Sequence, residues 1–409
     1  MTGKALDSLP GDVIILILKS LPNRRSLKAA VHASPIIHTA YLAARRGILQ
    51  AVLCHQHGGL VIMSDAIAAV RSTGLSACKA EDKEQIIALL DRWRRSLYDK
   101  PADTDEVASL LHLHDLATWF LEDFTKTMIA PIWIPETTWS TMKPLKLSKR
   151  ETRRFFRGFY RLQIWSNIFG NAVCDRTSTR IWNGVFTADK MIRLFFLTMP
   201  PWEMEEICCV WELLRNRVKP FYTQAANAVC EHASREIRIY SGQLDNFSRY
   251  HPSQWATTSR YDGLGALVTK GPAFVFGLLR KSARELESVI PASLMPRTKS
   301  FEWLLSLENP FDFVAAWPPP AQALVYPADI YKLGNFQQFK RHVATLPEEK
   351  QPNGCWMYGG SIQIDRSSPG FLHRILDIGP WYGPWQWGYA FWDRHRIFEW
   401  NVPDYAFPV

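Results

Sequence analysis

The chain has 409 residues, of which 47% are hydrophobic and 21% charged, and its formal net charge is +9. This balance is typical of globular proteins and excludes a wholly disordered chain. No segment approaches the roughly 20 apolar residues of a membrane span. The apolar run at residues 13–18 is cut off by Lys19, so it is too short for the core of a signal peptide. We therefore expect a protein of the cytoplasm, the nucleus or both.

The first fifty residues predict three short helices. Pro10 suits the first turn of a helix, and the apolar run that follows it leaves no purely polar face. A second helix is expected from about Ser26, and a third after Ser34 as cap and Pro35 at its first position. So small a module buries little surface by itself. Part of its apolar surface should therefore meet the rest of the chain or another protein.

Helical spacing continues beyond residue 50, after a break at Gly58-Gly59. The clearest signature is Ser148-x-x-Glu151, a capping box that precedes a broad aromatic face and a stop at Gly170. Prolines indicate an irregular connection over 129–145. Further helices are expected at 64–71, 80–95, 104–124, 187–197, 202–218, 221–238, 272–290 and 298–307.

Proline becomes frequent from Pro310 onward and leaves little room for long helices. Short strands are suggested there at 356–358, 362–364 and 389–392. The sequence thus predicts a mainly α fold in three parts. These are a three-helix module over 1–50, a helical body over 51–309, and a Pro/Trp-rich, partly irregular region over 310–409 that packs on the body.

Four blocks of the sequence carry a resemblance to a known family. The pattern Leu9-Pro10-x-Asp12-Val13-Ile14-x-x-Ile17-Leu18-x-x-Leu21 resembles the opening of an F-box, which docks substrate receptors onto the Skp-type adaptor of cullin–RING ubiquitin ligases. Asp12 stands where Glu is usual, and Ala33-Ser34-Pro35 occupies the place of the closing Trp. The segments 147–169, 202–206 and 385–394 resemble F-box-like proteins of filamentous fungi.

The resemblance implies a substrate receptor of an SCF-type ligase that has no chemistry of its own. Its N-terminal helices would bind the adaptor, and through it a cullin, while its body would bind a protein substrate. The residues expected to face the adaptor are Leu9, Pro10, Ile14, Ile17, Leu18 and Leu21. The residues expected on a partner surface of the body are Arg153, Arg154, Arg157, Arg161, Trp385 and Trp387. Tryptophans of the last quarter could instead close the helical core.

Two other functions stay open at this point. The basic aromatic helix at 149–169 could bind nucleic acid, or simply present a solvated basic face. Because the closing Trp is absent, the chain could also be a scaffold that has lost adaptor binding.

No motif indicates catalysis, a cofactor or a metal. His112 and His114 lie two residues apart on a helix and so do not share a face, and His55-x-His57 lacks a third ligand nearby. Cys208-Cys209 lies in an apolar helix, where packing is the expected role, and none of the seven cysteines forms Cys-x-x-Cys. We therefore expect a protein that is not an enzyme and holds neither cofactor nor metal.

Overall fold

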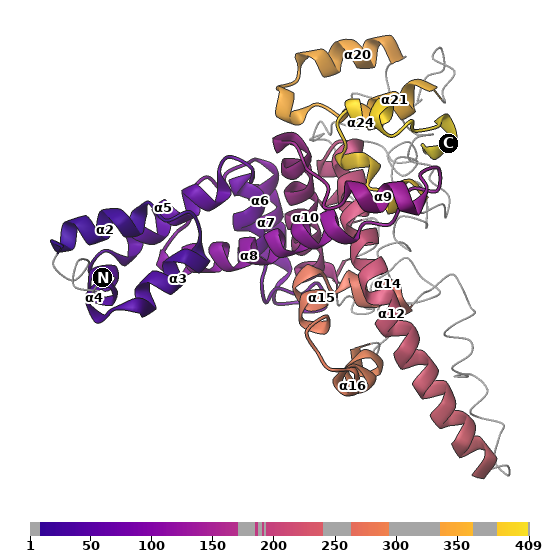
Figure 1. Ribbon diagram of the computed structural model, residues 1–409, viewed down its shortest axis with the longest axis horizontal. Coiled ribbons are helices and arrows are strands. Elements are labelled where there is room, and N and C mark those ends of the chain that lie inside the picture. Colours follow the sequence, from indigo (N-terminus) through magenta and orange to yellow (C-terminus); the bar gives the residue numbers. More distant parts are fainter. Residues whose placement is uncertain are drawn as a thin grey trace.

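The computed structural model describes residues 9–170, 185–186, 190–191, 194–239, 263–293, 336–362 and 383–407. Every regular element in these ranges is an α-helix or a 3-10 helix, which confirms the mainly α class. The helices near the N-terminus extend as an arm from one end of a larger body (Figure 1).

The arm consists of four helices: α2 (Gly11–Lys19), α3 (Arg24–Ala33), α4 (Pro35–Ala43) and α5 (Arg45–His57). Ser34 caps α4 as predicted, and its hydroxyl accepts a hydrogen bond from the Ile36 N–H at 3.2 Å. Helix α3 begins before Ser26, because the Asn23 side chain accepts from the Ser26 N–H and serves as the cap. The predicted boundary at residue 50 falls inside α5, which ends at His57.

The helices of the body surround α10 (Lys149–Phe169), which packs against α6, α8, α12 and α15. Ser148 and Glu151 form the predicted capping box: the Ser148 N–H donates to the Glu151 carboxylate at 2.9 Å, and the Glu151 N–H donates back to the Ser148 hydroxyl at 3.1 Å. The other helices are α6 (Met63–Arg71), α7 (Lys83–Arg94), α8 (Thr104–Thr127), α9 (Glu136–Met142), η1 (Phe196–Thr198), α12 (Pro201–Ile239), α14 (Gly263–Thr269), α15 (Pro272–Leu278) and α16 (Ala283–Ser293).

Three expectations for the body are corrected. The connection at 129–145 contains α9, which begins directly after Pro135. The helices expected on either side of Pro220 are one helix, α12, because a single proline removes one backbone donor without ending the helix here. The helix expected at 272–290 is two helices, α15 and α16. The segment 298–307 and much of 187–197 lie outside the described residues.

A glycine lets the two central helices approach closely. Gly158 lies on α10 where it faces α12, and a Cβ at this position would lie 2.6 Å from the Glu206 carbonyl oxygen. No side chain fits so short a distance, so only glycine permits this packing.

The described C-terminal part consists of short helices: α20 (Phe336–Thr345), η3 (Glu348–Lys350), α21 (Gly354–Ile362), α23 (Gly383–Gln386), η4 (Tyr389–Phe391), α24 (His395–Glu399) and η5 (Asp404–Ala406). Of these, η4 packs on α10 and α12, and α23 packs on α12. The strands suggested at 356–358 and 389–392 are therefore wrong: the first lies in α21, and the second covers η4 and the residue after it. The Asn353 side chain accepts from the Trp356 N–H at 2.8 Å and so caps α21. Residues 363–364 lie outside the described ranges.

Candidate protein-interaction site

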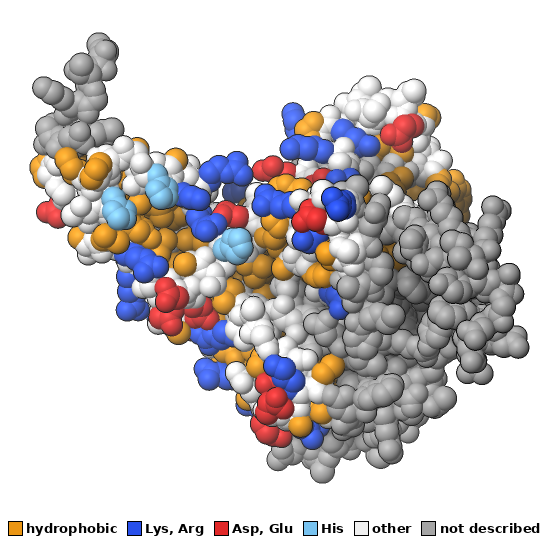
Figure 2. Space-filling model, turned by 90° about the horizontal axis from the view of Figure 1, so that it is seen from below, with side chains coloured by type: hydrophobic (Ala, Val, Ile, Leu, Met, Phe, Trp, Pro, Cys, Tyr) orange, Lys and Arg blue, Asp and Glu red, His pale blue; other side chains and the backbone are white. Residues whose placement is uncertain are grey.

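The arm exposes apolar side chains on two neighbouring helices. Val13, Leu16 and Ile17 are exposed on α2, and α2 packs against α4, on which Ile36 and Leu42 are exposed. Leu16 alone leaves 64% of its surface accessible. Figure 2 shows hydrophobic side chains at the outer end of the arm. These five residues, which we call the apolar face, are the part of the arm that a partner could cover.

Two of the six residues of the apolar run on α2 face inward instead. Ile14 and Leu18, both predicted to meet the adaptor, are buried in the core of the arm. Residues four apart lie on one side of a helix, so Ile14 and Leu18 share the inner face, while Val13, Leu16 and Ile17 share the outer one. Of the other predicted adaptor residues, Pro10 and Ile17 are exposed, and Leu9 and Leu21 are partly buried. The candidate contact residues therefore change to include Val13 and Leu16.

Polar contacts fix the arm against α8. The Asp115 carboxylate accepts from Arg24 at 3.0 Å and from the Gln56 amide at 2.7 Å. A second ion pair joins Arg45 and Asp105 at 3.4 Å. These contacts accompany the packing of α5 on α8 at the junction between the arm and the body.

Two buried histidines lie at the same junction. The rings of His57 on α5 and His114 on α8 are 4.8 Å apart, and His114 Nδ1 is 2.9 Å from the Tyr160 hydroxyl. Burial lowers the pKa of His57 to about 3 and that of His114 to about 4. Both rings are therefore neutral at pH 7.

The four α10 arginines predicted on a partner surface have partners within the protein, so that predicted surface is corrected. Arg157 is buried and donates to both carboxylate oxygens of Glu206 at 2.6 Å and to Glu203 at 2.7 Å. Arg161 pairs with Glu203 and with Asp65 on α6. We call these five residues the charge network. Burial opposes the charge on Arg157, but the Glu203 and Glu206 carboxylates raise its pKa above the ordinary value.

The remaining arginines of this predicted surface also have internal partners. Arg154 donates to the Asp393 carboxylate and to the Phe391 carbonyl oxygen, each at 2.8 Å. Arg153 donates to the Gly59 carbonyl oxygen at 2.7 Å. These four arginines are therefore not a free basic face, and the exposed basic residues at the start of α10 are Lys149 and Arg150.

The tryptophans of the C-terminal part close the core, as the alternative interpretation held. Trp385 and Trp387, predicted on a partner surface, are buried, and so are Trp392 and Trp400. The Trp385 indole N–H donates to the Glu205 carboxyl group. Burial raises the pKa of Glu205 to about 8, so this carboxyl group is mostly protonated at pH 7.

Three of the sequence blocks that carry the family resemblance meet in space. Glu151 of the first block accepts from the Asp393 N–H at 3.1 Å and from Arg396 at 3.1 Å, which ties 147–169 to 385–394 and the residues just after it. The block at 202–206 supplies Glu203 and Glu206 to the charge network and Glu205 to Trp385. These blocks are therefore structural: they fasten α10, α12 and the C-terminal part together.

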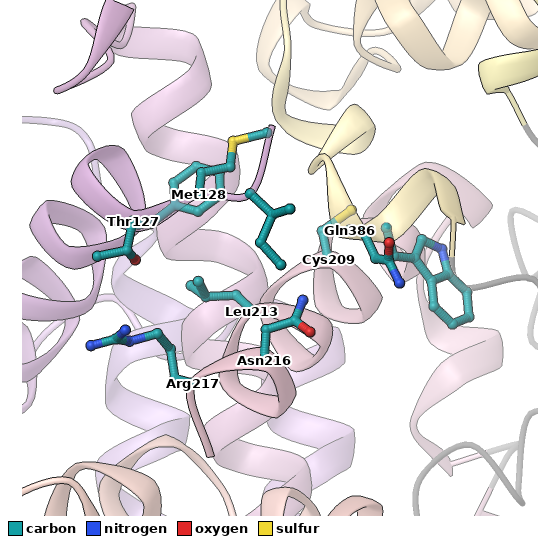
Figure 3. A pocket seen from close by; sticks show the side chains of 10 residues that line it. Thr127, Met128, Cys209, Leu213, Asn216, Arg217 and Gln386 are labelled. Atoms are coloured by element: carbon teal, nitrogen blue, oxygen red, sulfur yellow. The ribbon is translucent and has the colours of Figure 1, made fainter. Parts of the chain in front are cut away.

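A pocket of about 190 Å³ opens between α8, α12 and α23 (Figure 3). The side chains of Phe124, Met128, Leu213 and Trp385 give it an apolar lining. Asn216, Arg217 and Gln386 add amide and guanidinium groups. This is a small site with both apolar and polar character.

Comparison of the chain with protein-family models, curated proteins and solved structures finds no match.

Within the described ranges, no three His, Cys, Asp or Glu side chains are grouped so that they could hold a metal ion. No helix in the same part of the chain combines the length and apolarity of a membrane span. Cys208 and Cys209 are buried, and burial raises the pKa of both thiols. The apolar face and the pocket are thus the two features from which a function can be argued.

Proposed function

We propose that this protein is the substrate-receptor subunit of a cullin–RING ubiquitin ligase of the SCF type, and that the apolar face binds the Skp-type adaptor. The observation that carries the proposal is the exposure of Val13, Leu16 and Ile17 within the very stretch that resembles an F-box. Exposed aliphatic side chains on adjacent helices are suited to helix-in-groove binding.

The placement of the apolar face supports the proposal further. The arm lies at one end of the molecule, away from the C-terminal helices (Figure 1). Packing of α5 on α8, with ion pairs at Asp115 and Asp105, connects it to the body. A receptor of this kind acts by proximity, since it raises the effective concentration of a substrate near the conjugating enzyme. A packed connection between its two ends serves that role.

The experiment is affinity purification of the tagged full-length chain from its own cells, beside a Leu16→Asp/Ile17→Asp variant. Adaptor and cullin should be recovered with the unchanged chain and lost with the variant, because two charges would enter an apolar interface. A Leu97→Asp variant is the matched control, since Leu97 is a leucine of the body that is 55% exposed. Absence of adaptor and cullin from all three purifications would contradict the proposal and favour a scaffold that has lost the adaptor.

A further inference from the structure

The pocket between α8, α12 and α23 has the size of one side chain. Small-molecule and cofactor sites usually occupy about 300–1,000 Å³, whereas this pocket has about 190 Å³. An engineered apolar cavity of about 150 Å³ holds a single benzene. The pocket therefore fits one leucine, isoleucine, methionine or phenylalanine side chain and is too small for a nucleotide or a flavin.

The surroundings of the pocket continue its apolar lining onto the surface. Ile129 lines it and is itself exposed, and Ile132 in the same connection between α8 and α9 is 87% exposed. Ile132 is the most exposed of the large hydrophobic residues that the structure describes. If an apolar side chain of a peptide entered the pocket, the adjacent residues of that peptide could contact the exposed surface of Ile129.

The polar groups of the pocket match a peptide with an acidic residue. The Arg217 Nε lies 2.8 Å from the Asp123 carboxylate, and the arginine side chain is 36% exposed. No hydrogen bond of its two terminal nitrogens is found among the described residues. These two nitrogens present the parallel donors that bind a carboxylate. The side-chain amides of Asn216 and Gln386 offer both a donor and an acceptor, as a peptide backbone requires.

We propose that this pocket binds a protein segment in which one large apolar side chain lies within two residues of an Asp or Glu. The apolar side chain enters between Leu213, Met128 and Trp385, and the carboxylate of the segment pairs with Arg217. The role of such a segment as a ligase substrate rests on the proposed function. Its binding to the pocket does not, because the purified chain alone carries every residue involved.

The test uses four fluorescein-labelled hexapeptides with blocked ends, which share one Asp and differ in carrying Leu, Ile, Met or Phe beside it. Binding to the purified full chain is measured by fluorescence polarisation, without adaptor. At least one peptide should bind, and replacing its apolar residue by Ala or its Asp by Asn should each weaken binding about tenfold. No binding by any of the four would overturn the proposal, as would equal binding of the Asp and Asn forms.

Variants of the chain locate the site. Asn216→Trp should block the pocket and abolish binding. Arg217→Gln should weaken binding of the Asp peptide about tenfold and leave binding of the Asn peptide unchanged. The effects of Arg217→Gln in the chain and of Asp→Asn in the peptide should therefore not be additive. Lys219→Ala, an exposed change on the same helix, is the control and should bind as the unchanged chain does. Thermal unfolding confirms that each variant is folded. Full binding by a folded Asn216→Trp variant would place the peptide elsewhere and overturn the proposal.

Discussion

On α2, the leucine at position 16 exposes 64% of its surface, whereas on α10 the arginine at position 157 exposes 3%. The arm therefore leaves aliphatic side chains outside, and the body takes charged side chains inside. Each arrangement is costly unless something compensates it: a partner must cover the apolar face, and opposite charges must satisfy Arg157. The body contains its own compensation in Glu203 and Glu206. The apolar face of the arm has no such compensation within the described residues, and this difference is why we place the adaptor-binding surface on the arm.

The largest effect should come from breaking the charge network. Arg157→Met leaves the buried Glu206 carboxylate without its partner and Glu203 with Arg161 alone, and it should lower the free energy of unfolding by about 3–5 kcal/mol. Denaturant unfolding measures the change. Arg150→Met removes a more exposed arginine of the same helix, paired with Glu348, and should cost less than about 1 kcal/mol. Equal effects of the two variants would show that burial of the network does not matter to stability.

A second prediction concerns Glu205. Its pKa is about 8 in the folded chain and 4.5 ordinarily, so between these values the folded chain holds a proton that the unfolded chain has released. Stability contributed at this site therefore falls as the pH rises, by about 3 kcal/mol between pH 4.5 and pH 7. Glu205→Gln removes this dependence.

The measurement is the difference in unfolding free energy between Glu205→Gln and the unchanged chain at the two pH values. The variant should be close to the unchanged chain at pH 4.5 and more stable at pH 7. A difference that does not vary with pH would mean that the Glu205 carboxyl group is already ionised in the folded chain.

The junction between arm and body should respond to pH in the opposite sense. His57 has an ordinary pKa of 6.5 and a folded pKa of about 3, so below pH 6.5 the unfolded chain binds a proton that the folded chain does not. At pH 5 this costs about 2 kcal/mol of stability. His57→Leu should therefore stabilise the chain at pH 5 and change little at pH 7.5, as thermal unfolding at both pH values would reveal. The reverse pattern would contradict the burial of this ring.

The smallest effect is expected for Leu16→Ala, in a comparison of the two faces of α2. Leu18→Ala removes a side chain that is 1% exposed and should cost about 2–5 kcal/mol. Leu16→Ala removes an exposed one and should change stability by less than about 0.5 kcal/mol. Comparable losses in the two variants would show that the apolar face is covered by the chain itself.

Local signals predicted much of this structure. The Ser148–Glu151 capping box, the Ser34 cap and the Gly58 stop act within one helical turn, so their residues are sufficient to identify them. The inner and outer faces of α2 could not be separated, because both are apolar in sequence. The arginines of α10 looked like a solvated face, since their partners Glu203 and Glu206 lie more than 40 residues away. One signal was present: three glutamates in the otherwise apolar start of α12.

The most direct test of the account is the affinity of the purified full-length chain for a purified Skp-type adaptor, measured by calorimetry. Leu16→Ala/Ile17→Ala should lose several kcal/mol of binding free energy, as truncated interface anchors do, while Leu97→Ala should bind as the unchanged chain does. Unfolding should remain the same in all three. Unchanged adaptor affinity in the folded double variant, or no binding by the unchanged chain, would contradict the assignment of the apolar face as the adaptor-binding surface.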